Sequence, residues 1–235
     1  NAAKKPFCLV GQGVILGHAE EEVKAFLTKN DIPSGCTTLG LSALPSDFPQ
    51  NKGMLGMHGN IGPNRKTNEC DVLIAIGMRF DDRVTGDLKT YAKQAKVIHL
   101  DIDNSEIGKN VKVDVKILGN AKKTVPMLTD MIDVRQRPEW NAEFKPDEQE
   151  EYDKVIDKEL HPTSGYLKMG EVVNAVSEAT HHDAIIVTDV GQNQMIGVRY
   201  FKYKQTRSVV TSGGLGTMGF GLPATIGAKI GMPER

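Results

Sequence analysis

The chain has 235 residues, a formal net charge of −1 at pH 7 and three cysteines. This length allows one large or two modest domains, and the near-neutral charge gives no overall basic character that would indicate nucleic acid as a partner. No apolar run approaches the length of a membrane span, and the first residues lack the apolar core of a secretory signal. The cysteines are widely spaced without a Cys-x-x-Cys pair, so we expect reduced core thiols in a cytoplasmic protein.

The chain begins with the pattern of a nucleotide-binding unit. An apolar run at residues 7–10 ends in two glycines, Gly11 and Gly13, and residues 18–30 carry apolar side chains at helical spacing. Strand, glycine turn and helix in this order open a βαβ unit. The next glycine, Gly17, comes one position later than the dinucleotide-binding pattern requires, so this motif alone is a weak indication.

More strands are predicted farther along the first half of the chain. Apolar runs at residues 72–76, 97–101 and 111–115 alternate with helical or irregular segments, and residues 121–132 show one apolar helix face. Alternation of this kind is typical of an α/β fold with a parallel, doubly wound sheet. We therefore expect residues 1–133 to form a Rossmann-like domain.

A charged segment with several prolines separates this domain from a second one. Residues 134–165 offer little beyond a few aromatic side chains to seed a core, so we expect a linker with some surface helix. A helical pattern from residue 168 then leads to a strand at 184–188 and a polar loop at 189–195. Loops at the carboxyl ends of strands bind ligands in open α/β sheets. We expect residues 166–235 to be the beginning of a second α/β domain that is cut off at the end of the chain.

The glycine-rich run at residues 213–231 is the most informative stretch. Five glycines between residues 213 and 221 leave the backbone open to close approach by a ligand. Pro223 suits the first turn of a helix, and small residues at helical spacing after it give a smooth face for packing against another backbone. Amides at the start of this helix suit a phosphorylated ligand, although a tight buried turn that feeds a packed helix explains the same pattern.

Three runs in order along the chain carry a resemblance to a known family. They are the glycine-rich stretch at residues 211–224, Met-Leu-Gly-Met-His-Gly at 54–59 and Gly-Met-Arg-Phe-Asp-Asp-Arg-Val-Thr-Gly at 77–86. In these runs, and in their order and spacing from about residue 5 to the end, the chain resembles the thiamine-diphosphate enzymes. The resemblance is closest to the catalytic subunit of acetolactate synthase, also called acetohydroxyacid synthase.

The resemblance implies that the first domain is the middle domain of this family, which holds FAD as a largely structural cofactor. The positions that match its FAD contacts are Gly11, Gln12, Gly13, Thr37, Thr38, Leu39, Leu55, Gly56, Met57, His58, Gly77, Met78, Arg79, Asp81, Arg83, Val84, Asp101, Ile102, Gly119, Asn120 and Ala121. Thr37, Thr38 and Leu39 match a contact strand of the family. Asp101 and Asn120 stand where many relatives have glutamate and aspartate, so Asn120 brings no charge.

Two of these assignments compete with structural interpretations. Without its neighbours, His58 is more simply a surface histidine or a satisfied core histidine. Arg79 and Arg83 leave a strand end together and suit a pyrophosphate. They also suit a surface salt-bridge cluster with the acidic residues Asp81, Asp82 and Asp87.

For the second domain the resemblance implies a thiamine diphosphate site. Met218 matches the apolar wedge that keeps the cofactor folded, and the Gly216 carbonyl matches an acceptor for its aminopyrimidine. The loop that meets the diphosphate and the mouth of the site matches Val190, Gly191, Gln192 and Asn193. Asn193 and Ile196 stand where family members commonly have histidine and tryptophan, which bears on substrate handling.

Two essential parts of the family's site are expected outside this chain. The activating glutamate belongs to an amino-terminal domain that would precede Asn1, and the segment that holds Mg²⁺ would begin just beyond Arg235. We therefore expect a portion of the enzyme with no catalytic residue and no metal ligand of its own, which is inactive alone. The alternatives are another flavin-bearing relative, such as glyoxylate carboligase or pyruvate oxidase, and a non-catalytic nucleotide-binding module.

The activity that the resemblance implies is a transfer reaction on 2-oxo acids. The family decarboxylates pyruvate and joins the two-carbon unit to pyruvate or 2-oxobutanoate, which gives 2-acetolactate or 2-aceto-2-hydroxybutanoate for branched-chain amino acid synthesis. It uses thiamine diphosphate, FAD and Mg²⁺. Family members form homodimers or homotetramers, and a regulatory subunit is a further candidate partner. No nucleic acid or membrane partner is expected.

Overall fold

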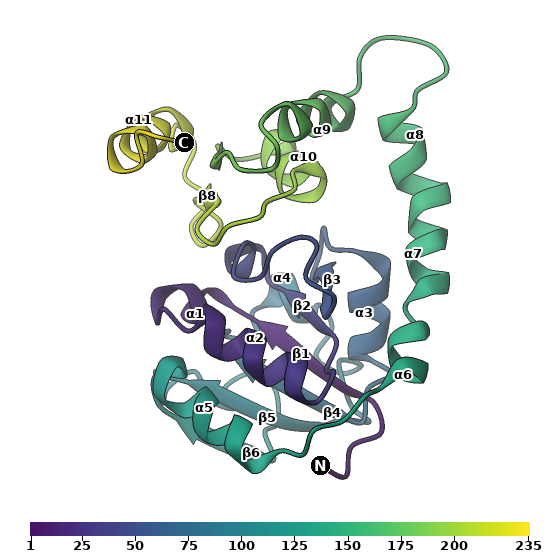
Figure 1. Ribbon diagram of the computed structural model, residues 1–235, viewed down its shortest axis with the longest axis vertical. Helices are drawn as coiled ribbons and strands as arrows, with labels where there is room; N and C mark the ends of the chain where they lie inside the picture. Colours follow the sequence, from purple (N-terminus) through teal and green to yellow (C-terminus); the bar gives the residue numbers. More distant parts are fainter.

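A six-stranded parallel sheet organises the first half of the chain in the computed structural model, which describes residues 1–235. Its strands are β1 (Pro6–Val10), β2 (Ser34–Cys36), β3 (Asn51–Met54), β4 (Val72–Ile76), β5 (Lys96–Asp101) and β6 (Val115–Leu118). They lie in the order β3-β2-β1-β4-β5-β6 (Figure 1). The winding therefore reverses between β1 and β4, which pair from Pro6↔Val72 to Val10↔Ile76. In open parallel sheets, ligands bind at this switch point.

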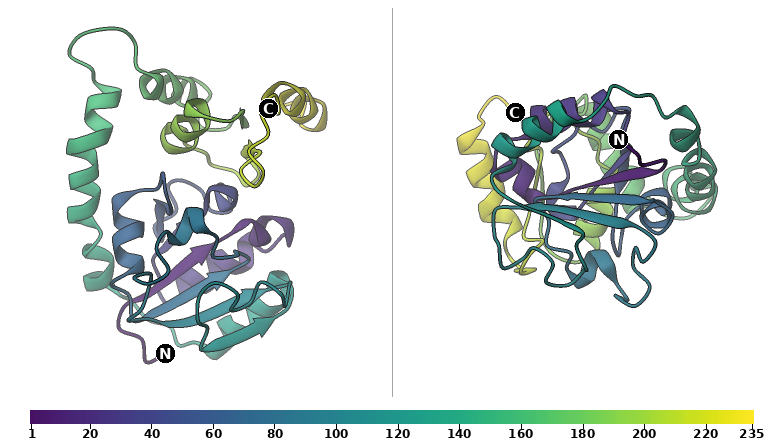
Figure 2. Two further views of the ribbon diagram at one scale, coloured as in Figure 1. Left: turned by 180° about the vertical axis from the view of Figure 1, so that it is seen from behind. Right: turned by 90° about the horizontal axis from the view of Figure 1, so that it is seen from below.

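Helices cover both faces of this sheet (Figure 2). Alternate residues of β1 enter two separate cores. Cys8 and Val10 enter the core of α1 (Gln12–Leu16), α2 (Glu20–Lys29) and α5 (Ala121–Met131). Phe7 and Leu9 enter the core on the other face, where α3 (Ile61–Thr67) and α6 (Pro138–Ala142) lie. Burial on both faces explains why the central strands are continuous apolar runs. The predicted α/β fold with a doubly wound parallel sheet is confirmed.

The three cysteines lie in these cores as free thiols. Burial raises the pKa of both Cys36 and Cys70 to about 12, so both are protonated at neutral pH. They act as small apolar side chains, as the sequence predicts for core thiols.

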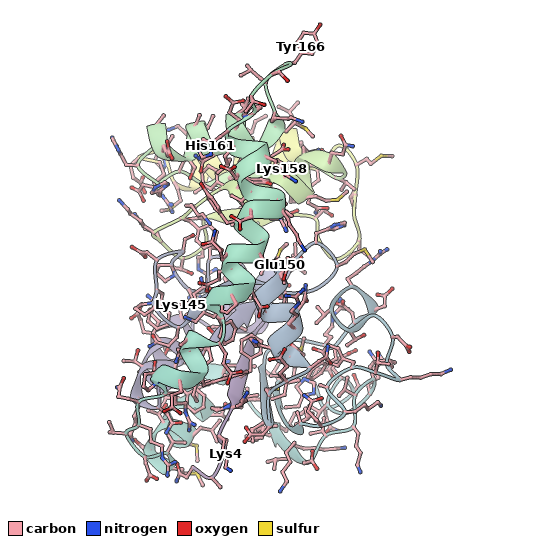
Figure 3. The ribbon with its side chains drawn as sticks, turned by 90° about the vertical axis from the view of Figure 1, so that its right-hand side faces the viewer. Lys4, Lys145, Glu150, Lys158, His161 and Tyr166 are labelled. Atoms are coloured by element: carbon pink, nitrogen blue, oxygen red, sulfur yellow. The ribbon has the colours of Figure 1, made fainter.

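A long helical segment runs along one side of the molecule (Figure 3). After α6 it consists of α7 (Lys145–Glu151), a π-helical turn (η2, Tyr152–Ile156) and α8 (Asp157–Leu160). Many of its charged residues border solvent, although Asp147 and Glu151 are only 6% and 4% exposed. Trp140 and Phe144 are 3% and 0% exposed and belong to the second core. These two belong to the few aromatic side chains that the sequence leaves as core candidates in this segment, and they cover a face of the sheet.

The second unit is smaller and more open than the first. It contains α9 (Met169–Ala179), β7 (Ile186–Thr188), α10 (Gln192–Tyr200), β8 (Val209–Thr211) and α11 (Gly221–Gly231), with β7 and β8 paired in parallel. A Cβ added to Gly227 or Gly231 would meet no atom within 4 Å, so the smooth face predicted for α11 has no packing partner among these residues. No helix in either unit combines bilayer-spanning length with sufficient apolar character.

One predicted strand of the first unit is misplaced, and two strands are not predicted from the sequence. The strand predicted at residues 111–115 lies later, as β6, because Val111 and Val113 pack against the second core from an irregular segment. Strands β2 and β3 are not evident from the sequence, since Ser-Gly-Cys and Asn-Lys-Gly-Met contain no apolar run. Pairing with β1 gives β2 its place, and β3 pairs with β2.

Candidate functional site

The residues predicted for FAD all lie at one edge of the six-stranded sheet. Each of the loops that contain them follows the carboxyl end of one strand, from Gly11 after β1 to Ala121 after β6. In a parallel sheet these ends share an edge, so the fold brings together residues that are more than 100 positions apart in sequence.

Gly11, Gly13 and Gly77 pack the loops after β1 and β4 directly against each other. A Cβ on Gly11 would overlap the Gly77 oxygen, and a Cβ on Gly13 would lie 2.7 Å from the Gly77 Cα. The Gly13 N–H donates to the Gly77 oxygen at 2.9 Å. Loop packing therefore explains these glycines, and the Gly13 amide is not free for a phosphate. Gln12, between the two glycines, is exposed.

Thr37, Thr38 and Leu39 form a turn after β2, so the contact strand predicted there is wrong. The 3₁₀ turn spans Thr38–Gly40, and the Thr37 hydroxyl caps it by accepting the Gly40 N–H at 3.1 Å. A Cβ on Gly40 would overlap the Val10 oxygen. The chain bends here because the Gly40 backbone lies directly against the end of β1.

The loop after β3 is joined to the arginine-bearing loop after β4. The Met57 N–H donates to the Arg83 oxygen at 2.8 Å, and Arg83 Nη1 lies 3.5 Å from the Met57 sulfur. Gly56 has φ +101° and a Cβ there would lie 2.8 Å from the same Arg83 oxygen, so this position requires glycine. Met57 is 60% exposed and His58 is also exposed, which leaves a thioether and an imidazole open to a ligand.

Arg79 and Arg83 have no short contact to a carboxylate. Arg79 Nη2 lies 3.5 Å from Asp81 Oδ2, and no carboxylate lies within 4 Å of the Arg83 guanidinium. The Asp81 side chain instead caps α4 (Asp82–Thr85) by accepting two backbone N–H groups of that helix. Asp82 and Asp87 pair with neither arginine, so the competing salt-bridge cluster is reduced to one long contact. Both exposed guanidiniums are free to bind an anion.

The loops after β5 and β6 leave fewer groups free. Asp101 is 8% exposed and its Oδ1 accepts a backbone N–H at 2.9 Å, whereas Oδ2 has no intramolecular donor. Ile102 is 69% exposed. The Asn120 oxygen caps α5 at 2.9 Å, and its amide NH₂ has no acceptor. A Cβ on Gly119 would lie 2.6 Å from Thr124 Cγ2, so packing accounts for this glycine.

Some matched positions present no exposed side chain. Leu55, Met78 and Ala121 are 2%, 4% and 5% exposed, and Val84 packs against the second core. The side chains of these residues therefore pack inside the protein and support the loops.

In the second unit, residues 190–193 begin α10 with open backbone donors. Gly191 caps the helix with φ +106°, and the N–H groups of Gln192 and Asn193 have no intramolecular acceptor. The Asn193 side chain donates to the Val190 oxygen at 3.2 Å and so stays within its own loop. Free amides at the start of a nine-residue helix favour an anion such as a diphosphate.

The glycine-rich loop before α11 presents its backbone and one side chain to solvent. Ser212 holds its first turn, since the Ser212 oxygen accepts the Gly216 N–H at 2.8 Å and Ser212 Oγ accepts the Thr217 N–H at 3.0 Å. Gly216 has φ +64° and its own oxygen accepts no intramolecular hydrogen bond. Met218 is 83% exposed. A free carbonyl and an exposed thioether fit the roles predicted for Gly216 and Met218.

Asp189, which is not among the site residues predicted from the sequence, connects these two loops. Its Oδ1 accepts the N–H groups of Val190 at 2.8 Å and Gly219 at 3.0 Å, and its Oδ2 accepts the Gly221 N–H at 2.8 Å. These backbone donors, that of Gly221 most strongly, hold the pKa of the Asp189 carboxyl below its usual range. The one signal in the sequence is an acidic residue directly after a strand. Because Asp189 already binds the first amide of α11, that amide is not available to a phosphate.

The two predicted cofactor regions are neighbours in space. A Cβ on Gly213 would lie 2.9 Å from Leu39 Cδ2, so the glycine-rich loop touches the turn after β2. A cleft of about 190 Å³ beside α7 and another of about 230 Å³ near Tyr91 contain none of the predicted cofactor residues. No group of three or more potential metal ligands gathers anywhere in the chain.

Comparisons with known proteins find family models that match both units. Residues 1–128 match the family model described as the thiamine pyrophosphate enzyme, central domain, and residues 189–235 match the C-terminal TPP binding domain of the same enzymes.

The probable acetolactate synthase large subunit of Methanocaldococcus jannaschii is 42% identical over 98% of this chain and 40% of its own length. The acetolactate synthase large subunit of Lactococcus lactis is 40% identical over 100% of the chain and 40% of its own length. Isozyme 2 of Escherichia coli is 38% identical over 99% of the chain and 41% of its own length. The chain thus spans about 40% of the length of these curated relatives.

Proposed function

This chain belongs to the thiamine pyrophosphate enzyme family, and from that premise we propose that it is a portion of an acetolactate synthase large subunit. One observation carries the proposal. Proteins named acetolactate synthase large subunit are about 40% identical to this chain over nearly all of its length. The portion comprises an FAD-binding middle domain at residues 1–133, a linker at 134–165 and the first part of a thiamine diphosphate domain at 166–235.

The proposed reaction joins two 2-oxo acids. Pyruvate loses CO₂, and its two-carbon unit is added to the carbonyl of a second pyruvate or of 2-oxobutanoate. The products are 2-acetolactate and 2-aceto-2-hydroxybutanoate. Thiamine diphosphate, when bound, would supply an acidic thiazolium carbon as the nucleophile and electron acceptor that this chemistry requires.

The residues of this chain bind and orient the cofactor in this proposal. The free N–H groups of Gln192 and Asn193 donate to the diphosphate. The Gly216 oxygen, which has no intramolecular donor, accepts from the aminopyrimidine. Met218 supplies an exposed apolar side chain against which the cofactor folds. The activating glutamate and the Mg²⁺ ligands are proposed to come from the rest of the enzyme.

We also propose that FAD binds at the carboxyl edge of the six-stranded sheet. Arg79 and Arg83 hold its pyrophosphate, because both guanidiniums are exposed and neither has a short carboxylate contact. Met57 and His58 lie against the flavin, and Asp101 Oδ2 accepts a ribose hydroxyl. The flavin holds the loops of the sheet edge in place and takes no part in the net reaction.

The enzyme is proposed to act as a homodimer or homotetramer. The name "large subunit" of the relatives supports a smaller regulatory subunit as a second partner. The exposed apolar residues of α11, Leu222, Ile226 and Ile230, support further contacts for the second unit.

Flavin titration tests the FAD site. FAD is titrated into the chain while its fluorescence is followed, with Arg79→Ala and Arg83→Ala beside the unchanged protein. Each substitution removes a charge-assisted hydrogen bond to the pyrophosphate, so we expect the Kd to rise about tenfold or more. Arg135→Ala is the matched control, because Arg135 is exposed and pairs only with Asp133 at 3.6 Å. Equal Kd values in all four proteins contradict the proposed arginine contacts.

An activity assay tests the reaction. The protein encoded by the complete gene is incubated with pyruvate, thiamine diphosphate, Mg²⁺ and FAD, and acetolactate is measured after its conversion to acetoin. We expect product only when thiamine diphosphate is present, and none from residues 1–235 alone. A parallel incubation contains glyoxylate in place of pyruvate. Release of CO₂ from glyoxylate without acetolactate formation from pyruvate contradicts the proposal, as does acetolactate made by residues 1–235.

A further inference from the structure

One carboxylate bridges the two loops that the proposed function assigns to thiamine diphosphate. Asp189 follows β7 and precedes the loop at residues 190–193, to which it is bound through the Val190 N–H at 2.8 Å. The same carboxylate reaches about 30 positions ahead to the glycine-rich loop, where it accepts the N–H groups of Gly219 at 3.0 Å and Gly221 at 2.8 Å. No other side chain hydrogen-bonds to both loops.

The glycines of this loop fit the bridge. Gly219 has φ +83°, which turns its amide towards Asp189 and is costly for a residue with a Cβ. A Cβ on Gly221 would lie 3.2 Å from Asp189 Oδ2, closer than most real Cβ contacts. Gly219 and Gly221, which the sequence predicts as points of ligand approach, are therefore also required by a contact within the protein.

Asp189 is not available as a ligand of the cofactor or of a metal ion. Both of its oxygens already accept backbone N–H groups, and no cluster of three potential metal ligands includes it. A negative side chain would also repel a diphosphate in direct contact. Its effect on the site must therefore pass through the loops that it holds.

We propose that Asp189 is a positioning residue for the thiamine diphosphate site, which fixes the loop bearing Gly216 and Met218 at a set distance from the diphosphate-binding amides of Gln192 and Asn193. This inference rests on the proposed function. The cofactor must touch both loops at once, one with its aminopyrimidine and the other with its diphosphate. A loop held in advance loses less conformational entropy when the cofactor binds, so the bridge increases affinity.

A carboxylate suits this task better than an amide does. Three N–H groups require two acceptor oxygens, and the charge strengthens each hydrogen bond. In Asp189→Asn one oxygen becomes an NH₂ group, which has no lone pair for Gly219 or Gly221 and places donor against donor. The variant keeps the size of the side chain, so it tests the bridge with little change in packing.

Two measurements test the inference, and both compare Asp189→Asn with the unchanged protein. The control is Asp183→Asn, because Asp183 is a half-exposed acid of the same unit that accepts from Gln205 at 2.6 Å, lies 3.7 Å from Arg235 Nη2 and touches neither loop. First, amide hydrogen exchange at Gly219 and Gly221 is followed by NMR in ¹⁵N-labelled chain without cofactor. We expect exchange about tenfold faster or more in Asp189→Asn and unchanged in Asp183→Asn.

Second, the Kd for thiamine diphosphate with Mg²⁺ is measured by equilibrium dialysis in the protein from the complete gene. We expect Asp189→Asn to raise the Kd about tenfold or more, while kcat at saturating cofactor stays within about threefold. Gly219→Ala, which strains the same amide from the other side of the bridge, should weaken binding in the same direction. Each variant is first checked for a native-like NMR spectrum.

The outcomes separate this inference from the proposed function. If the unchanged protein binds thiamine diphosphate and Asp189→Asn binds it equally well, the positioning role is overturned and the function stands. If amide exchange at Gly219 and Gly221 is unaffected by Asp189→Asn, the bridge itself is overturned. If the unchanged protein fails to bind thiamine diphosphate, the proposed function is overturned, and the role of Asp189 falls with it.

Discussion

His99 is a buried imidazole that makes one hydrogen bond. It is 0% exposed in β5, and Nε2 lies 2.8 Å from the Met78 oxygen, so this nitrogen carries the proton. Its Nδ1 has no partner, and the ring packs edge-on against Phe80 with 5.0 Å between centroids. Burial lowers the pKa of His99 below its usual value of about 6.5. The folded protein therefore holds this side chain in its neutral form.

The buried, neutral state of His99 predicts that the stability of the protein depends on pH. Because the unfolded chain binds a proton near pH 6.5 that the folded chain does not, the free energy of unfolding should fall as the pH drops below about 6.5. The loss amounts to at most about 1.4 kcal/mol per pH unit for one group. The unfolding free energy is measured by urea denaturation at several pH values between 7 and 5. Plotted against pH, it should have a shallower slope in His99→Gln than in the unchanged protein. His161→Gln, at an exposed position, serves as control, and equal slopes in all three proteins would contradict the prediction.

At the scale of elements, the backbone contact between the loops after β1 and β4 predicts that a larger residue at position 13 destabilises the protein. Gly13→Ala places a methyl group 2.7 Å from the Gly77 Cα, so we expect a loss of about 1–3 kcal/mol in unfolding free energy. Gly227→Ala is the matched substitution in an open helix, where nothing lies within 4 Å, and it should stabilise by about 0.5–1 kcal/mol. Both changes in unfolding free energy are to be measured by urea denaturation. An unchanged free energy of unfolding in Gly13→Ala would show that the loops separate easily.

The elements also show how far the sequence predicts this fold. Apolar runs locate β1, β4 and β5 almost to the residue, because strands buried on both faces need such runs. The short strands β2 and β3 escape prediction, since their place comes from pairing with neighbours. The loop residues at the sheet edge follow from the resemblance. Their contacts do not, because Gly13 meets Gly77 and Asp189 meets Gly221 only once the chain has folded.

At the scale of the whole molecule, Glu151 ties the two units together. This residue is 4% exposed, and its carboxylate accepts the Asn60 side chain at 2.8 Å and the Ile61 N–H at 2.8 Å in the first unit. It also accepts Arg199 Nη2 of α10 at 2.9 Å. A second contact joins Ser46 and Tyr203, whose N–H donates to Ser46 Oγ at 3.0 Å.

We expect Glu151→Gln to uncouple the two units. The substitution leaves the largely buried Arg199 without its carboxylate, at a cost of about 3 kcal/mol. The single tryptophan, Trp140, reports only on the first unit, whereas circular dichroism reports on both. In Glu151→Gln the circular dichroism signal should therefore begin to fall at a lower urea concentration than the Trp140 fluorescence changes. Glu150→Gln, one position earlier on the more exposed side of the helix (Figure 3), should keep the two curves together. Coincident curves in both variants would contradict the coupling.

Trp140 and Phe144 cover strand β1 of the first unit, although they follow it far along the chain. The Trp140 Nε1–H donates to the Pro6 oxygen at 2.8 Å, and the Phe144 ring lies 5.7 Å from that of Phe7. A ribosome releases β1 first and these two covering residues more than 130 positions later. The growing chain therefore carries β1 without this aromatic cover until these two residues have been added, and apolar surface exposed in that interval favours aggregation.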